Sequence, residues 1–363
     1  MSVSSSEPET IRCPVCLDRF VWQEDELWIP TGEAGVYEAV DLTEVNDPVK
    51  RNDIRRNCYQ RCPNPSQDTD SHHLPASYLD YGPPLVIGLA GRSGSGKTHL
   101  LTSMISELER GGLHAATGLT VRAMDLLLDR RFRTEHLNRL QRDEELEGTR
   151  HGLSGFVNVL TLTSATGTTP ITFFDVSGED FLREGDRGRA ARFLIGVDAL
   201  LFVDTPEHAL GIRHEEPDDG QRVNLAFKRV VSRLEDLGLT DRVPASVVLN
   251  KSDRLRYVPP VDRWIRRSDD EELNAESMLE ESRDVFGFLH QNGAVSSLAP
   301  FQSFTRCTLH FASATGAESV DRRFVRGVRP MRVLRPLLAL LAMTGVLTGP
   351  EARKVGSWHV QTS

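Results

Sequence analysis

Short apolar runs alternate with longer amphipathic stretches over most of this chain. The apolar runs predict strands at Leu85–Ala90, Phe156–Thr163, Ile171–Asp175, Ala199–Asp204, Val247–Leu249 and Cys307–Ala312. Apolar positions that recur on one side of a helix predict helices at Leu100–Leu108, Arg122–Glu147, Leu225–Leu237, Arg256–Asn292 and Arg335–Val346. This alternation favours an α/β domain with a doubly wound sheet, which the last helix covers; a membrane-surface or partner helix is the alternative for that segment.

Two local patterns refine this outline. The turn-forming residues 164–170 predict that the strands on either side of them form an antiparallel hairpin. Ahead of the α/β pattern, the strand-like pieces Phe20–Trp22, Leu27–Ile29 and Val36–Val40 indicate a small separate sheet. Residues 63–84 carry spaced prolines among polar residues, which is typical of a linker.

The composition is that of a globular chain, with 363 residues, 39% hydrophobic residues, 26% charged residues and a net charge of -9. The length favours two or three domains. The negative charge argues against a general nucleic-acid or anionic-membrane binder. The polar start lacks a secretory signal, and Leu337–Leu347 is too short to span a bilayer. We therefore expect a cytoplasmic protein.

Four of the five cysteines form two close pairs near the start of the chain, Cys13 with Cys16 and Cys58 with Cys62. Two such pairs supply the four thiolates of a tetrahedral structural zinc site, which suits a zinc-ribbon-like domain. His72 and His73 could each replace a cysteine as a ligand, or are exposed linker residues. The same cysteines could also be four free thiols or include a redox C-x-x-C, although no thioredoxin-like pattern surrounds Cys13.

A phosphate-binding motif follows the first long apolar run. Residues 91–98 read Gly-Arg-Ser-Gly-Ser-Gly-Lys-Thr, which fits G-x-x-x-x-G-K-[ST]. A strand that turns through glycines into a helix points several backbone N–H groups at one spot, where triphosphate oxygens fit. A glycine-rich turn capping an ordinary helix is the alternative, but such a turn does not need the lysine. The predicted nucleotide-binding residues are Gly91, Ser93, Gly94, Ser95, Gly96, Lys97 and Thr98.

The residues of this loop have different expected roles. Lys97 is predicted to reach the β and γ phosphates, and the Thr98 hydroxyl to ligate Mg²⁺. Asp175, which closes the second hairpin strand, is the expected second anchor for Mg²⁺. Gly178, three residues later, can bring its N–H close to a γ-phosphate. A strand-ending aspartate in a turn is the alternative interpretation of this second motif.

Asn250-Lys251-Ser252-Asp253 follows the strand Val247–Leu249 and indicates a guanine nucleotide. The Asp253 carboxylate can accept hydrogen bonds from the ring N–H and the exocyclic amine of guanine, which adenine lacks in that arrangement. Asn250 and Lys251 are expected to tie this loop to the phosphate loop. After the last predicted strand, Ser313-Ala314 offers a backbone N–H for the guanine O6 oxygen. An ordinary polar turn is the alternative at each place.

These motifs, in this order, resemble those of the translation-factor and Ras-like class of P-loop GTPases and cover residues 85 to about 347. The resemblance implies the P-loop NTPase fold, a mostly parallel six-stranded sheet with one antiparallel edge and helices on both faces. A zinc ribbon before such a domain, with Asp-Val-Ser-Gly-Glu in place of Asp-x-Ala-Gly-Gln, looks most like bacterial double-GTPase proteins. Those proteins are associated with multi-gene systems of biological conflict.

The chain is thereby divided into a zinc-ribbon-like domain at 1–62 with a disordered start, a linker at 63–84, a P-loop domain at 85–347 and a tail at 348–363.

The sequence departs from the family pattern at positions that matter for hydrolysis. Glu179 stands where Ras-like members have the glutamine that orients the attacking water, and a carboxylate there would also repel the γ-phosphate. Ser93 stands where glycine is frequent and can crowd an inserted arginine. Our choice for the switch threonine is Thr149, ahead of Thr163, Thr166, Thr168 and Thr169.

Three functions compete on these residues. The first is a GTP-hydrolysing switch that uses Mg²⁺, with Lys97, Glu179 and Thr149 as catalytic residues and an unidentified protein partner that reads the bound state. The second is a scaffold that binds GTP or GDP without hydrolysing GTP and uses its Zn²⁺-bearing domain as the working surface. The third is an ATP-using P-loop kinase or ATPase, which leaves the Asn250–Asp253 motif unused.

Overall fold

The computed structural model describes residues 10–22, 26–31, 35–67, 69–147, 156–165, 167–177, 193–210, 225–268 and 272–357. For residues 79, 156–158, 175–177 and 225 it describes the backbone alone. Within the ranges described, none of the helices combines the length and the apolar character needed to cross a membrane.

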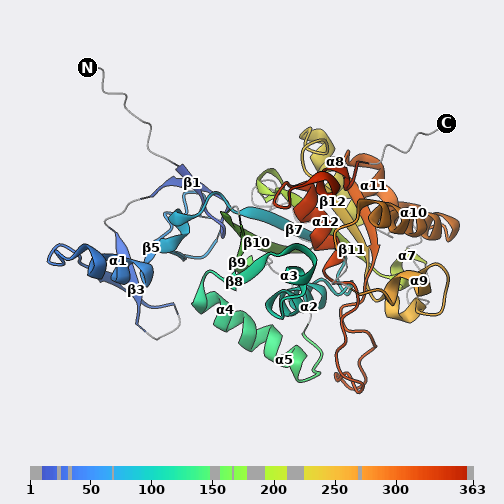
Figure 1. The fold of residues 1–363 in the computed structure, drawn as a ribbon, viewed down its shortest axis with the longest axis horizontal. Helices are drawn as coiled ribbons and strands as arrows, with labels where there is room; N and C mark the ends of the chain where they lie inside the picture. The colour runs from blue at the N-terminus through green and yellow to red at the C-terminus, as the bar shows by residue number, and fades with distance from the viewer. Residues whose placement is uncertain are drawn as a thin grey trace.

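A mixed seven-stranded sheet forms the centre of the larger part of the molecule (Figure 1). Its order is β13-β12-β11-β7-β10-β9-β8. The strands from β13 to β10 are parallel neighbours, whereas β9 is antiparallel to both β10 and β8. The strands are β7 (Leu85–Gly91), β8 (Thr120–Ala123), β9 (Phe156–Ser164), β10 (Gly167–Ser177), β11 (Ala199–Asp204), β12 (Ala245–Leu249) and β13 (Cys307–Phe311).

All six predicted strands of the α/β part are therefore present, and the predicted hairpin is β9 with β10. The seventh strand, β8, was not predicted. It occupies the start of the segment 122–147, for which the sequence predicted one long helix.

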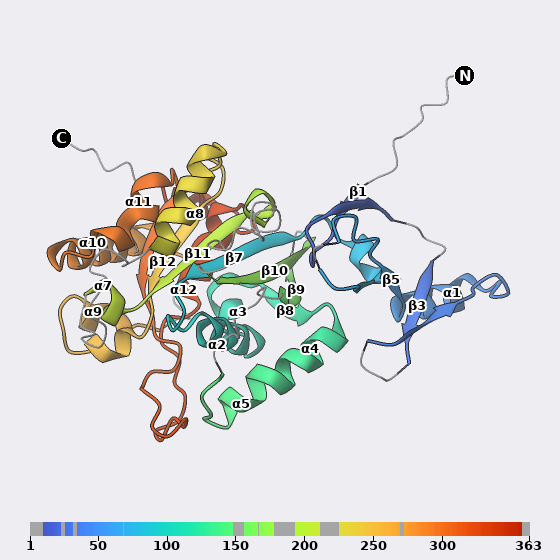
Figure 2. The same ribbon diagram turned by 180° about the vertical axis from the view of Figure 1, so that it is seen from behind.

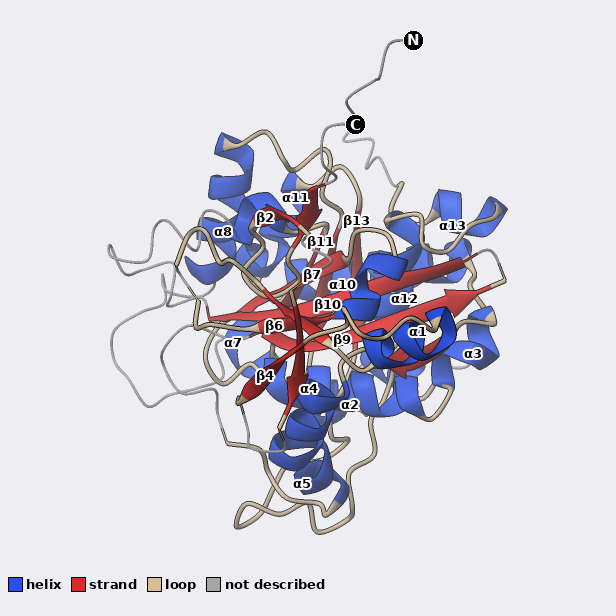
Figure 3. Ribbon diagram, turned by 90° about the vertical axis from the view of Figure 1, so that its left-hand side faces the viewer, coloured by secondary structure: helices blue, strands red, loops and turns tan. Residues whose placement is uncertain are grey.

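Two apolar cores fill the two faces of the sheet. Side chains alternate across a strand, so β7 supplies Ile87 and Leu89 to one core and Val86 and Ala90 to the other. The first core lies against α2 (Lys97–Glu109) and α12 (Arg335–Met343), and the second against α8 (Leu225–Asp236) and α10 (Ala275–Gln291). Figure 3 shows helices on both sides of the strands. The last predicted helix does cover the sheet, because every residue of α12 is buried.

Two predicted helices are shorter than expected because polar residues begin new helices inside them. The Asp125 side chain accepts hydrogen bonds from the N–H groups of Leu127 and Leu128, so α4 (Leu126–Phe132) begins there. Asn274 begins α10 in the same way within the segment 256–292. The other helices are α3 (Gly112–Thr117), α5 (Asn138–Gln141), α7 (Pro206–Ala209), α9 (Val261–Ile265), α11 (Ala299–Ser303) and α13 (Pro350–Lys354), with a π-helical stretch at Arg133–Leu137.

The N-terminal module contains two small sheets. One is the hairpin of β1 (Thr10–Arg12) and β2 (Arg19–Val21). The other has the order β4-β3-β5-β6, with β3 at Leu27–Pro30, β4 at Tyr37–Val40, β5 at Tyr59–Arg61 and β6 at His73–Pro75. One helix, α1 (Pro48–Arg56), belongs to this module.

The module extends further along the chain than predicted. Residues 73–80, expected in a linker, form β6 and a 3₁₀ helix, and the Tyr78 hydroxyl donates to the Arg12 carbonyl. The expected C-terminal tail likewise contains α13, whose Ala352 enters the first core together with Val355. Prolines in both segments end strands or begin helices instead of marking unstructured chain.

The module docks at the amino ends of the central strands (Figure 2). The Arg12 guanidinium donates to the carbonyls of Pro84 and Gly196 and pairs with Asp198, which also accepts from the Val86 N–H. The side chain of Leu17 packs against Gly196. These contacts join the module to the sheet at the edge opposite the carboxyl ends of the strands.

Candidate functional site

The phosphate-loop motif lies at the point where the chain connections of the sheet change direction. β7 runs between β10 and β11 and is parallel to both. The connection that leaves β7 leads to the β8–β9–β10 side, and the one that leaves β10 crosses to β11 on the other side. Ligands of open α/β sheets bind in the crevice that such a reversal creates at the carboxyl ends of the strands.

The loop between β7 and α2 has the tight geometry that its glycines predict. Gly96 has φ 80° and is the residue from which α2 begins. A Cβ at Gly91 would lie 2.4 Å from the Val203 carbonyl oxygen, so β11 tolerates only glycine there. The Lys97 ammonium donates to the carbonyls of Gly91 (2.9 Å) and Arg92 (3.1 Å) and folds back over the loop.

Asn250 joins the phosphate loop to the loop that follows β13. Its Nδ2 donates to the Ser95 carbonyl at 3.0 Å, and its Oδ1 accepts from the Ala314 N–H at 3.0 Å. The neighbouring Lys251 donates through Nζ to the Gly94 carbonyl at 3.0 Å. Three segments that are distant in the sequence are thereby held together by two adjacent side chains.

Asp253 is held by Ser313. The Ser313 hydroxyl donates to Asp253 Oδ1 at 2.6 Å and accepts from the Gly316 N–H at 2.9 Å. Both side chains are buried. A serine donor on one carboxylate oxygen fixes the plane of the carboxylate and leaves the other oxygen for a further donor.

These residues surround one cavity of about 440 Å³. Its walls include the predicted residues Ser93, Gly94, Gly96, Lys97, Thr98, Asn250, Lys251, Asp253 and Ala314. Gly91, Ser95 and Ser313 stand behind the wall and hold it through the contacts given above. Lys97 and Asp253, which are 156 positions apart in the sequence, therefore face the same space.

The cavity also has a wall that the sequence did not predict, made by His99, Glu145, Leu146, Glu318, Ser319 and Phe324. His99 Nε2 accepts from the Leu146 N–H at 3.1 Å, and its ring meets the Phe324 ring edge to face. Burial lowers the pKa of His99 to about 4, so the ring is neutral and able to accept. No motif marks these residues, because their role depends on contacts between distant segments.

Most of this wall is a clasp between residues 143–147 and residues 319–328. The Glu145 N–H donates to the Arg322 carbonyl and the Phe324 N–H to the Asp143 carbonyl, each at 2.8 Å. Asp143 Oδ1 accepts from the Val328 N–H at 2.8 Å. The segment 143–147 leads directly into residues 148–155, so the clasp holds the chain at the point where the predicted switch segment begins.

Some predicted residues cannot be placed completely. The backbone of Asp175 pairs with Leu89 of β7, and Ser177 pairs with Gly91, so β10 ends beside the phosphate loop. The side chain of Asp175 lies outside the described part of the structure, as do Thr149, Gly178 and Glu179.

A second cluster of chemistry-bearing residues lies in the N-terminal module. Cys13, Cys16, Cys62 and His72 bring their ligand atoms within 4.8 Å of one another. The Cys16 and Cys62 sulfurs are 3.7 Å apart, and Cys13 Sγ is 3.2 Å from His72 Nε2. His72 Nδ1 is 2.8 Å from the Asp70 carbonyl, which fixes the ring with Nε2 facing the sulfurs.

Cys58, predicted as the fourth ligand, lies outside this cluster. Cys58 and Cys62 flank the extended strand β5, and four residues of extended chain span about 13 Å. The sulfurs of Cys58 and Cys62 are therefore too far apart to bind the same metal ion. Cys58 is instead buried in a separate apolar group with Leu27 and Ala76. The predicted alternative that a histidine replaces a cysteine fits the structure, with His72 in that place.

No protein-family model matches the sequence, and the search of curated proteins finds no relative. Among solved structures, the chain is similar to a bacterial selenocysteine-specific elongation factor, with 13% sequence identity and a TM-score of 0.29. The match covers 64% of this chain but only 26% of the elongation factor. The chain is also similar to a Chaetomium thermophilum signal recognition particle receptor complex, SRb-GTP/SRX (16%, TM-score 0.31, 67% of this chain and 96% of that chain). A third is the Trypanosoma brucei Arl6 BBS3 small GTPase with bound GppNp (14%, TM-score 0.30, 73% and 99%). Similarity at these TM-scores does not decide between functions.

Proposed function

We propose that this protein binds guanine nucleotides in the cavity between the phosphate loop and Asp253, and that it is a GTP-hydrolysing switch. The observation that supports this most directly is the Ser313–Asp253–Asn250 arrangement. Ser313 orients the Asp253 carboxylate toward the cavity, and Asn250 ties the same region to the phosphate loop. A buried carboxylate with one oxygen already satisfied selects a base that presents N–H donors, which guanine does.

The residues of the phosphate loop are suited to the triphosphate. Backbone N–H groups at the start of α2 favour negative charge, and the Lys97 ammonium adds a positive charge that a phosphate oxygen can draw away from the Gly91 carbonyl. The Thr98 hydroxyl and the Asp175 carboxylate are oxygen donors of the kind that Mg²⁺ prefers, and we assign the ion to them. When bound, Mg²⁺ would neutralise charge on the phosphates.

The hydrolytic step depends on residues outside the described ranges. We assign Glu179 to the orientation of the attacking water and Thr149 to the sensing of the γ-phosphate, as the sequence suggests. If Glu179 instead repels the γ-phosphate, the protein binds GTP and keeps it, which is the scaffold alternative. Membership of the double-GTPase group, and a role in conflict systems with a protein partner, remain hypotheses that rest on the sequence alone.

The test is single-turnover hydrolysis of GTP by the purified protein, together with competition between GTP, GDP and ATP for the site. Release of phosphate that the Lys97→Ala variant does not produce supports the switch. Tight GTP binding without phosphate release selects the scaffold. Equal displacement of bound GDP by ATP and by GTP refutes guanine recognition and leaves a P-loop ATPase or kinase.

We also propose that Cys13, Cys16, Cys62 and His72 hold a structural Zn²⁺. Three thiolates and one imidazole form a closed tetrahedral set, and zinc would stabilise the module, which has a small apolar core. Hydrogen bonds with Cys13 and Cys16 lower the pKa of Cys62 to about 4, whereas burial and the neighbouring Cys16 and Cys62 thiols raise the pKa of Cys13, so binding of zinc must displace the Cys13 proton.

Metal analysis of two matched variants tests this assignment. We expect Cys62→Ser to lose the zinc and Cys58→Ser to keep one equivalent, because only Cys62 reaches the cluster. Loss of zinc from both variants, or from neither, refutes this set of ligands.

A further inference from the structure

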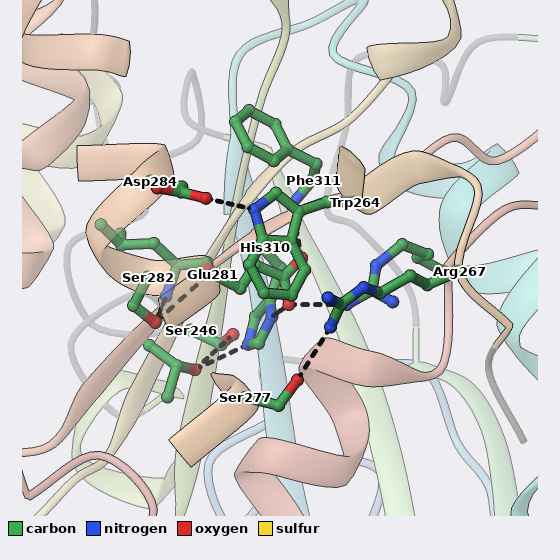
Figure 4. Close-up of polar contacts among 12 residues, drawn as sticks. Ser246, Trp264, Arg267, Ser277, Glu281, Ser282, Asp284, His310 and Phe311 are labelled. Atoms are coloured by element: carbon green, nitrogen blue, oxygen red, sulfur yellow. Dashed lines mark hydrogen bonds and ion pairs between the residues drawn. The ribbon is translucent and has the colours of Figure 1, made fainter. Parts of the chain in front are cut away.

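A fully buried carboxylate, Glu281 on α10, lies beside His310 and Phe311 at the end of β13, the strand that leads to Ser313 and Ala314 (Figure 4). It accepts from the Arg332 guanidinium at 2.7 Å and from the Phe311 N–H at 3.2 Å. His310 Nδ1 lies 3.0 Å away on the same carboxylate, and His310 Nε2 lies 3.0 Å from the Thr308 hydroxyl. A neutral imidazole that donates through Nδ1 and accepts at Nε2 satisfies both contacts.

The residues that Glu281 holds stand on both sides of Ser313. Phe311 is the last residue of β13, two positions before Ser313. Arg332 follows Met331, which exchanges two backbone hydrogen bonds of 2.9 Å with Ser313. One carboxylate therefore fastens the strand that enters the Ser313 loop and the segment that pairs alongside it.

The position of Ser313 in turn determines the orientation of the Asp253 carboxylate. Its hydroxyl is the donor to Asp253 Oδ1, and its loop is packed so closely that a Cβ on Gly316 would lie 2.3 Å from the Arg329 carbonyl oxygen. A small shift of this loop cannot be absorbed locally and would move the hydroxyl relative to the carboxylate.

We propose that Glu281 is a positioning residue for base recognition: it fixes the Ser313 loop from behind, and through it the Asp253 carboxylate, without touching the nucleotide. This inference rests on the proposed binding of guanine nucleotides. Asn250 joins this loop to the phosphate loop through the Ala314 N–H, whereas Glu281 holds the chain on both sides of Ser313. Loss of the Glu281 contacts should therefore affect the base contact more than the phosphate contacts.

The experiment compares the affinities of GDP and IDP, which differ only in the exocyclic amine that Asp253 is expected to bind. Arg332 and His310 share one carboxylate oxygen of Glu281, and the Phe311 N–H donates to the other. In Glu281→Gln the side-chain NH₂ must therefore face either the Phe311 N–H or both Arg332 and His310, and each choice sets donor against donor and disturbs the fastening. We expect the GDP-to-IDP affinity ratio to fall about tenfold, since hydrogen bonds to a charged group are the ones lost, while IDP affinity changes little. Asp284→Asn is the matched control, because Asp284 lies on the same helix and accepts from Trp264 Nε1 at 2.6 Å.

Each result decides the proposal. An unchanged ratio in folded Glu281→Gln, or an equal fall in Asp284→Asn, overturns it. If Glu281→Gln does not fold, the double variant Glu281→Gln/Arg332→Met removes both charges together, which proteins often tolerate, and carries the same test. Failure of both to fold makes Glu281 a stability element alone and overturns the proposal. Absence of any GDP binding in the unaltered protein would instead refute the proposed function.

Discussion

Replacement of Asp253 by asparagine should change the preferred base from guanine to xanthine. The Ser313 hydroxyl donates to Asp253 Oδ1 and must keep an acceptor there, so the amide oxygen of an asparagine stays toward Ser313. The amide NH₂ then takes the place of the second carboxylate oxygen and faces the base. A donor at that point opposes the amine of guanine and pairs with the 2-oxo group of xanthine.

The magnitude follows from the contacts that change. A hydrogen bond to a charged group is worth about 1.5–3 kcal/mol, and an unpaired buried donor costs about 1–3 kcal/mol. Their sum is about 2.5–6 kcal/mol, which corresponds to a loss of GDP affinity of roughly 10²- to 10⁴-fold. Because the phosphate contacts are unchanged, XDP should bind the variant about as tightly as GDP binds the original protein.

The assay is titration calorimetry of GDP and XDP with the original protein, with Asp253→Asn and with Asp262→Asn. The last variant makes the same change of charge on α9, at a residue that does not line the cavity. If Asp253→Asn keeps its GDP affinity and gains none for XDP, the base does not lie against residue 253, and the reasoning from Ser313 is wrong.

Three further predictions concern the supports of the cavity. Asn250→Ala leaves the Ala314 N–H without its acceptor and should lower the free energy of unfolding by about 2–4 kcal/mol, measured by urea denaturation. Asp143→Gly removes the acceptor of the Val328 N–H and should loosen the clasp that walls the cavity, so that labelled GDP both associates and dissociates faster. Asp143→Asn keeps an acceptor oxygen and should leave both rates unchanged. A change in the dissociation rate alone would show that the clasp is not a barrier to entry of the nucleotide. Burial alone would raise the pKa of Glu281, but the Arg332 guanidinium and the hydrogen bonds from Arg332 and His310 hold it at about 2. The stability that the ionised carboxylate contributes is therefore present above pH 4.5 and is lost as the pH falls; between pH 6 and pH 3 we expect a loss of about 2 kcal/mol that the charge-neutral double variant lacks.

The central strands and the two nucleotide-site loops were predictable because each depends on neighbouring residues. The apolar run before Gly91 and the helical pattern after Thr98 define the phosphate loop without any distant contact. Asn250 and Asp253 follow a buried strand, and the carboxyl ends of parallel strands meet at one edge of a sheet. Convergence on one cavity follows from that geometry.

The clasp was beyond the sequence for the opposite reason, and the fourth ligand of the metal cluster was left open between Cys58 and a histidine. Residues 143–147 precede β9 and residues 319–328 follow β13, two strands that lie near opposite edges of the sheet. The two segments meet through long irregular connections, which carry no periodic pattern in the sequence. The close spacing of Cys58 and Cys62 suggested a pair, but the chain between them is an extended strand. Whether four residues turn or extend decides whether two sulfurs meet, and β5 extends because it pairs with β3 and β6.

The contacts of the docked N-terminal module lead us to expect that it and the larger part unfold together. Arg12 is paired with Asp198 of the larger part, and Tyr59 donates to the N-cap residue of α4, so neither part keeps its surface intact alone. A protease cut or truncation at residue 84 would not yield an independent nucleotide-binding domain, because a carboxylate and an apolar face would be exposed at the amino edge of the sheet. Chelation of the metal should accordingly lower the melting temperature of the entire molecule in a single transition.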